Sequence, residues 1–181
     1  FLVLAYAPKG MSCFLVPRVL PDGTRNSLRF MRLKDKLGNR SNASAELEFD
    51  STMAWIVGEE GRGVPTIIDM VHATRLDVAN WGVSLMRQAV TQAGWHVANR
   101  DAFGATLIDK PLMQNVLADL EIEVEAATLM ITRLSGAHER MEVDEHERAF
   151  ARLATPIAKY WLTKQSNPVV REALECVGGN G

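Results

Sequence analysis

Two patterns of apolar residues divide the chain. Up to about residue 57, apolar residues form short runs separated by turns such as Pro8-Lys9-Gly10 and Pro21-Asp22-Gly23. The clearest run is Ala45–Phe49, where apolar and acidic residues alternate and so face opposite sides of a strand. We therefore expect an antiparallel sheet that is part of a larger one. The predicted strands are residues 1–7, 11–16, 27–33, 45–49 and 55–57. The glycine cluster at 58–63 lacks the lysine and hydroxyl of a phosphate-binding loop, and we interpret it as a linker.

From Val64 onward, apolar residues recur every three or four positions, which is the period of a helix. Pro156 should kink or split one of the resulting helices. The short connections predict an up-down four-helix bundle. The expected fold class is thus α+β, with an antiparallel β-domain remnant at 1–60 followed by the bundle at 61–181. The predicted helices run from Val64 to a corner near Asn99, from about Pro111 to about Arg140, from Asp144 onward, and from an N-cap at Asn167 to Gly178.

One arginine interrupts the apolar row of the first predicted helix. Arg75 requires a buried partner, a position at the edge of the apolar face, or an anionic ligand, because an unpaired buried charge is very costly. The residues alone leave these alternatives open. The predicted rows are Val64, Ile68, Val71, Val78, Gly82, Leu85 and Ala89 in the first helix, Met113, Val116, Leu120, Val124, Ala127, Ile131 and Leu134 in the second, and Phe150, Leu153, Ile157, Trp161 and Lys164 in the third.

The corner between the first two helices carries candidate chemistry. Arg100 offers a planar set of donors suited to phosphate, and Phe103 offers a flat apolar face. Gly104 can adopt a positive φ, and Asp109 can N-cap the next helix, with Pro111 in its first turn. The alternative is a capped corner with a solvated arginine. Likewise, the glycine run 178–181 either ends a helix or offers backbone N–H groups to a pyrophosphate.

The composition excludes several classes of protein. With 47% hydrophobic and 23% charged residues, the chain is typical of globular proteins, and its net charge of −2 argues against a surface built mainly for nucleic acid. Cys13 and Cys176 make no metal or redox spacing, which suits a cytoplasmic protein, and the four histidines form no ligand pattern. No apolar run is long enough for a membrane span. Both ends look cut, so we expect the chain to be part of a longer protein.

Several short motifs occur in the order found in acyl-CoA dehydrogenases, and the chain resembles that family over essentially its whole length. The stretch 33–44, preceded by Phe14-Leu15-Val16-Pro17 and by the Pro21–Gly23 turn, is similar to the AidB-like branch of bacterial adaptive-response flavoproteins. The motifs are Lys36-Leu-Gly-Asn-Arg-Ser-Asn-Ala-Ser44, Phe49, Gly58-x-x-Gly-x-Gly63, Thr74-Arg75, Arg100-x-x-Phe-Gly104 and Gly178-Gly-Asn-Gly181.

The resemblance implies a fold and a set of contacts. Residues 1–60 would be the C-terminal part of the family's middle β-domain, and residues 61–181 would be most of its helical bundle. The bundle would hold a homotetramer, a dimer of dimers, with FAD between subunits, and Arg75 would face the acyl-CoA. Many members carry glutamine in place of Glu175, whose carboxylate a pyrophosphate would repel. The cofactor-binding residues implied are Arg100, Phe103, Gln114, Glu175, Gly178 and Gly179.

The resemblance also implies a reaction, the α,β-dehydrogenation of an acyl-CoA thioester. A glutamate removes the α-proton, and the β-hydride passes to flavin N5. That glutamate normally follows the glycine turn, beyond Gly181, or in a minority of members stands where this chain has Thr74. We therefore expect no catalytic base in residues 1–181, and expect these residues alone neither to turn over substrate nor to hold FAD tightly.

Two alternatives stay open beside the dehydrogenase. The first is an AidB-like flavoprotein that binds and protects DNA through a region after Gly181 and has weak dehydrogenase activity. The second is a helical oligomerisation module without a ligand. An electron-transfer partner is compatible with the dehydrogenase interpretation, whereas the acyl-chain length and the electron acceptor cannot be read from these residues.

Overall fold

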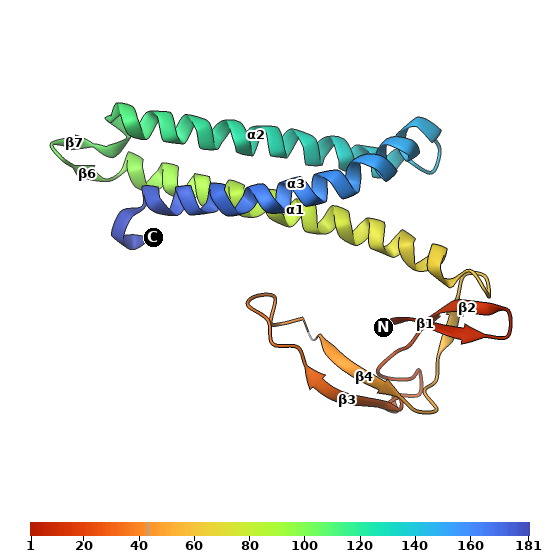
Figure 1. Cartoon of the computed structure of the whole chain (residues 1–181). Coiled ribbons are helices and arrows are strands. Elements are labelled where there is room, and N and C mark those ends of the chain that lie inside the picture. The colour runs from red at the N-terminus through yellow and green to blue at the C-terminus, as the bar shows by residue number, and fades with distance from the viewer. Residues whose placement is uncertain (43) are drawn as a thin grey trace. The chain divides into compact units, whose positions relative to one another are not determined.

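The computed structural model describes residues 1–42 and 44–181 (Figure 1). Ala43, which belongs to the family-like stretch 36–44, lies outside the described residues. The chain forms two compact units, residues 1–70 and residues 71–181. The expected division at residue 60 between a β-domain and a helical bundle stays a prediction. In the part of the chain that is described, no helix has both the length and the apolar character needed to cross a bilayer.

The first unit contains the five predicted strands, each within one residue of its expected bounds. All strand pairings are antiparallel. Between β3 and β4, Arg29 lies opposite Glu48 with 3.3 Å between their charged groups, which explains why one face of β4 is acidic. The strands are β1 (Leu2–Ala7), β2 (Gly10–Leu15) and β5 (Trp55–Val57), in the order β1-β2-β5, and the separate pair β3 (Leu28–Leu33) and β4 (Ala45–Phe49).

The glycine cluster at 58–63 is a packed junction, and the linker interpretation was wrong. The fully buried Ser12 side chain accepts a hydrogen bond from the backbone N–H of Gly61 at 2.8 Å and donates one to the carbonyl of Gly10 at 3.0 Å. Gly63, the first residue of the following helix, lies against the backbone of Ser12 and Cys13. Glycine is needed at Gly63 because any side chain there would meet backbone atoms of β2.

An alanine at Gly63 should destabilise the protein by about 1–3 kcal/mol, the usual cost of overpacking. Its Cβ would lie 2.7 Å from the backbone nitrogen of Cys13 and in contact with the carbonyl carbon of Ser12. Gly94→Ala is the matched control, because no described atom outside its own helix lies within 4 Å of the added Cβ. We expect that control to stabilise the helix by up to about 1 kcal/mol. Equal unfolding midpoints for the two variants in denaturant would contradict this account.

The second part of the chain is helical, which confirms the expected α+β class. Residues 63–181 as described contain three long helices instead of the four predicted: α1 (Gly63–Ala98), α2 (Pro111–Arg140) and α3 (Glu145–Cys176). They run up, down and up (Figure 1). Asp144 caps α3 as expected, because its side chain accepts hydrogen bonds from the backbone N–H groups of His146 and Glu147.

The predicted third and fourth helices are one continuous helix. Neither Pro156 nor Pro168 ends α3. Buried side chains on both sides of each proline, such as Thr155 and Val169, hold the helix in place by packing. The Asn167 side chain, expected to cap a new helix, instead donates to the Thr163 carbonyl one turn earlier. Tertiary packing therefore outweighs the preference of proline for a helix start.

The core of the bundle uses the predicted row of α2 but other rows of α1 and α3. On α2, Leu120, Val124, Ala127, Ile131 and Leu134 are buried, which confirms the row, while Met113 and Val116 pack at its edge. Most positions of the rows predicted for α1 and α3 are exposed or half-buried, although Gly82 is buried and Ala89 and Phe150 pack against the core. Both helices are apolar on more than one side, and periodicity does not choose between the sides. The buried core residues are Ala79, Gly82, Val83, Met86, Val90, Ala93 and Val97 on α1 and Ala151, Thr155, Ala158, Leu162, Val169, Ala173 and Cys176 on α3.

Salt bridges from one glutamate to two arginines stabilise the turn between α2 and α3. The largely shielded Glu147 accepts hydrogen bonds from Arg133 at 2.7 and 3.1 Å and from Arg140 at 3.2 Å. These bonds, that of Arg133 first, hold the pKa of Glu147 below its usual range, although partial burial acts in the opposite direction. Arg133 also stacks on the ring of Phe150 at 4.3 Å. The turn between the helices is thereby fixed by charge as well as by packing.

Candidate functional site

The corner after α1 is a tight hairpin with an aromatic residue at its tip. β6 (Asp101–Ala102) pairs with β7 (Ala105–Thr106), and Phe103 and Gly104 form the turn with φ values of +56° and +80°. Two consecutive positive φ values are typical of the turns that match the twist of a hairpin. The prediction that Gly104 supplies a positive φ is confirmed, although Gly104 serves a hairpin and not a helix stop.

Hydrogen bonds hold this hairpin and leave the side chains of Arg100 and Phe103 open. Lys110 donates to the carbonyl of Phe103 at 2.9 Å, and Thr106 donates to the carboxylate of Asp101 at 2.8 Å. The ring of Phe103 is 91% exposed, and Arg100 is also exposed, with no salt bridge to the described residues. The corner thus presents a cation and a flat ring on a fixed backbone.

The start of α2 differs from the prediction in its cap. Asp109 does not N-cap the helix, because it ends the short 3-10 turn η1 (Leu107–Asp109). The N-cap is Lys110, whose side chain makes no cap hydrogen bond, and Pro111 occupies the first turn as expected. Gln114 lies in that first turn and is exposed.

The second glycine turn lies at the same end of the bundle as the corner (Figure 1). After α3 the chain forms the 3-10 turn η2 (Gly178–Asn180), with Gly178 at φ +65°. Glu175, Gly178 and Gly179 are exposed. The up-down-up order brings the end of α1, the start of α2 and the end of α3 together, so all six predicted cofactor residues share one end of the bundle.

Arg75 lies far from that end. Its side chain is half-buried and makes no hydrogen bond or salt bridge among residues 1–42 and 44–181. Along α1, the rise of a helix separates Arg75 from the last residue, Ala98, by about 35 Å. The neighbouring Thr74 hydroxyl donates to the carbonyl of Val71 at 3.0 Å. The structure therefore does not bring Arg75 together with the corner within one chain.

The residues at the corner fit a dinucleotide that bears a diphosphate. An open guanidinium matches phosphate oxygens in geometry and charge, and an open aromatic ring offers a stacking face. Glu175 at the same end adds a negative charge, which opposes an anion. Six residues open to solvent also mean that this end of a single chain encloses no ligand, so a bound group would need a second surface.

In the described part of the chain, no three His, Cys, Asp or Glu side chains lie where they could hold a metal ion. Cys13 and Cys176 are both buried and free. Burial, followed by the nearby charge of Glu172, raises the pKa of the Cys176 thiol, which makes this thiol unreactive near neutral pH.

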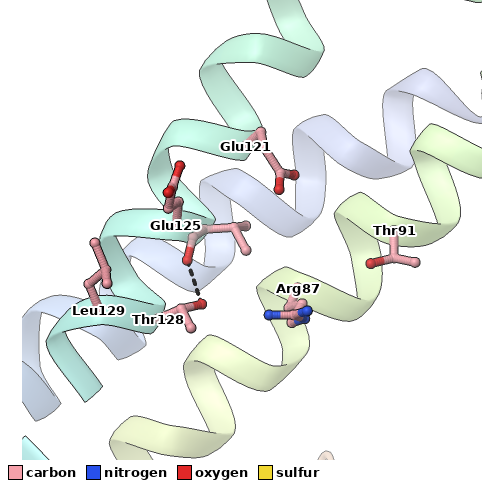
Figure 2. Close-up of a pocket in the computed structure, with 7 residues that line it drawn as sticks. Arg87, Thr91, Glu121, Glu125, Thr128 and Leu129 are labelled. Carbon is pink, nitrogen blue, oxygen red and sulfur yellow. Dashed lines mark hydrogen bonds between the residues drawn. The ribbon is translucent and has the colours of Figure 1, made fainter. Parts of the chain in front are cut away.

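A polar hollow of about 440 Å³ lies between α1 and α2 (Figure 2). Arg87 from α1 faces it, and no salt bridge within 4.0 Å joins Arg87 to Glu121 or Glu125 in the residues described. None of the predicted site residues lines this hollow. The sequence gives no signal for it, because Arg87 stands among other polar helix positions. The lining residues are Arg87, Thr91, Glu121, Val124, Glu125, Thr128 and Leu129.

Comparisons with known proteins concern both parts of the chain. Residues 61–181 match the protein family described as "Acyl-CoA dehydrogenase, C-terminal domain". AidB of Escherichia coli (strain K12) is 47% identical over 180 residues, which cover 99% of this chain and 33% of AidB. "Acyl-CoA dehydrogenase family member 11" of Caenorhabditis elegans is 34% identical over 176 residues, 96% of this chain and 28% of that protein. The chain thus spans about a third of the length of these relatives.

A solved structure agrees with the sequence comparison. Caenorhabditis elegans ACDH-11, in a complex with C11-CoA, superposes with a TM-score of 0.85 and 33% identity over 95% of this chain and 30% of that one. The likeness extends over the strands as well as the helices, since nearly the whole chain is covered.

Proposed function

Because the chain belongs to the acyl-CoA dehydrogenase family, we propose that it forms part of an FAD-dependent enzyme that introduces an α,β double bond into an acyl-CoA thioester. The observation that carries the proposal is the match over residues 61–181 to the family's C-terminal domain. When bound, FAD supplies the acceptor for the β-hydride. Residues 1–181 would contribute by binding and orienting FAD and the acyl-CoA.

The proposed cofactor site is the corner end of the bundle. Arg100 would neutralise a diphosphate, and Phe103 would cover a flat ring, since both side chains are open on a rigid hairpin. Gln114 would add a neutral hydrogen-bonding group. Gly178 and Gly179 would let the backbone approach the ADP portion of FAD closely, whereas Glu175 would oppose the phosphates.

We propose that the complete site needs two subunits of a homotetramer. The corner and Arg75 are about 35 Å apart along α1, so the substrate arginine of one chain would meet the cofactor residues of another. Exposed apolar side chains on the outer side of the bundle support association, because surfaces of this kind mark interfaces. They include Trp81, Leu85 and Trp95 on α1 and Leu153, Ile157, Tyr160 and Trp161 on α3.

Arg75 is the proposed acyl-CoA contact. A half-buried guanidinium without a partner among the described residues suits an anionic ligand. ACDH-11 was solved with C11-CoA, which makes an acyl-CoA of this class a reasonable first substrate to test. Thr74 supplies no carboxylate, and its hydroxyl is bonded to its own helix. We assign the proton-abstracting role to no residue in 1–181.

The function is tested on the full-length protein with its flavin. Anaerobic addition of medium-chain acyl-CoA should bleach the flavin absorbance, because the hydride reduces the flavin. An electron-transfer flavoprotein should then restore the absorbance if it is the acceptor. The DNA-protecting alternative, with its weak dehydrogenase activity, predicts instead at most slow bleaching of the flavin, together with duplex binding that weakens steeply with salt. That pair of results would overturn the dehydrogenase proposal.

Arg100→Met should weaken FAD binding by about tenfold or more, because a charge-assisted hydrogen bond typically contributes about 1.5–3 kcal/mol. The full-length variant would be freed of flavin and titrated with FAD by fluorescence. Arg87→Met is the matched control, since Arg87 is another exposed arginine that lies outside the proposed site. The assignment of Arg100 fails if both variants bind FAD as tightly as the unaltered protein.

A further inference from the structure

A histidine of α2 and a threonine of α3 meet at a polar contact inside the bundle. Nε2 of His138, on α2, lies 2.8 Å from the hydroxyl of Thr155, on α3. Thr155 is fully buried and His138 is half-buried. His72, on α1, is also half-buried and lies close enough for its charge to act on His138. The contact therefore joins α2 to α3, and a histidine of α1 acts on it through its charge.

The neutral form of His138 suits this position. Burial, and then the charge of His72, lower the pKa of His138 below its ordinary value of 6.5. No carboxylate acts on His138 in the described residues to stabilise its charged form. With both rings protonated, two imidazolium groups would repel each other beside a hydroxyl that carries no countercharge.

The charged groups nearest along each helix do not supply that countercharge. Arg140 is occupied by Glu147, and Arg148 donates to the backbone carbonyls of Met141 and Glu142. Glu139 and Glu142 on α2 are exposed. The remaining charged residues within five positions of His72 or Thr155 are Asp69, Arg75 and Asp77 on α1, of which both aspartates are exposed, and Arg152 and Lys159 on α3.

We propose that His138 and Thr155 form an acid-sensitive latch between α2 and α3, and that the charge of His72 on α1 makes it more sensitive. With His138 neutral, its bond to Thr155 ties α2 to α3. Protonation places an unpartnered charge in the contact and loosens this end of the bundle. The unfolded chain then binds more protons than the folded one between pH 6.5 and the lower value in the folded protein. The contribution of His138 to the free energy of unfolding is therefore fully present above pH 6.5. It is lost as the pH falls from 6.5 through the lower pKa of His138 in the folded protein.

The first test follows the ring of His138 by NMR in the full-length protein, with the signal assigned by its absence from His138→Gln. The ring should titrate below 6.5, and His72→Gln should move its midpoint upward, because one repelling charge is gone. A midpoint at or above 6.5 in the unaltered protein, or no change with His72→Gln, would overturn the latch. This readout does not depend on whether other variants fold.

The second test compares thermal midpoints between about pH 7 and pH 5. The unaltered protein should lose stability over this range, and His138→Gln should lose much less, since glutamine keeps a hydrogen-bonding group but does not titrate. His146→Gln is the matched control, because His146 is an exposed histidine at the start of α3. The latch is refuted if His138→Gln and His146→Gln lose the same stability as the unaltered protein.

Discussion

Leu134→Ala should destabilise the helical unit by about 2–5 kcal/mol, the usual cost of truncating a buried leucine. Leu134 is 1% exposed and belongs to the core shared by α1, α2 and α3.

The control for this variant lies on the same helix. Leu129 is 66% exposed, so Leu129→Ala removes the same atoms from a surface position and should change stability by less than about 0.5 kcal/mol. Denaturant unfolding of the full-length variants, followed by circular dichroism, measures both free energies. Similar losses would mean that Leu134 is not at the centre of the core.

Arg75→Met should lower kcat/KM for an acyl-CoA substrate by about 100-fold, within the range expected when a charge-assisted contact to an anion is removed. The prediction depends on the half-buried guanidinium having no partner among the described residues. Because the substrate would be its only countercharge, removing the arginine should not destabilise the protein. Arg75→Lys keeps the charge without the planar fork and should recover only part of the loss.

Steady-state kinetics of the flavin-loaded full-length protein tests this prediction. Arg87→Met serves again as the control, because Arg87 is an exposed arginine on the same helix. If Arg75 is a structural residue, Arg75→Met should lower the thermal midpoint and leave kcat/KM unchanged. That pattern would remove Arg75 from the proposed substrate site.

Elements with a single apolar face could be predicted from the sequence almost completely. The row of α2 has one possible buried side and was confirmed. The strand at β4 was also confirmed, with Ala45 and Leu47 half-buried but Phe49 exposed. The rows of α1 and α3 could not be predicted in this way, because Trp81 and Trp161 give those helices a second apolar side that stays exposed in one chain. That α3 continues through Pro168 also could not be predicted from the sequence, since it depends on packing by distant residues.

The candidate site, too, could be predicted only in part. The sequence predicted Arg100 and Phe103 at a corner between helices. The hairpin that exposes them depends on the pairing of β6 with β7, which no sequence motif predicted. The hydrogen bond between His138 and Thr155 also could not be predicted from the sequence, because the two residues stand 17 positions apart on different helices. Local spacing in the sequence can identify residues suited to a ligand. Whether these residues are exposed, and how far apart they lie, can be known only from the three-dimensional structure.

The backbone at Phe103 has one more consequence. A left-handed conformation costs a residue with a side chain roughly 1–2 kcal/mol, and glycine avoids that cost. The fold alone would therefore favour two adjacent glycines at the tip of this hairpin. The phenyl ring stands there against the preference of the main chain and is 91% exposed among the residues described. We infer that it serves a contact with another molecule or subunit.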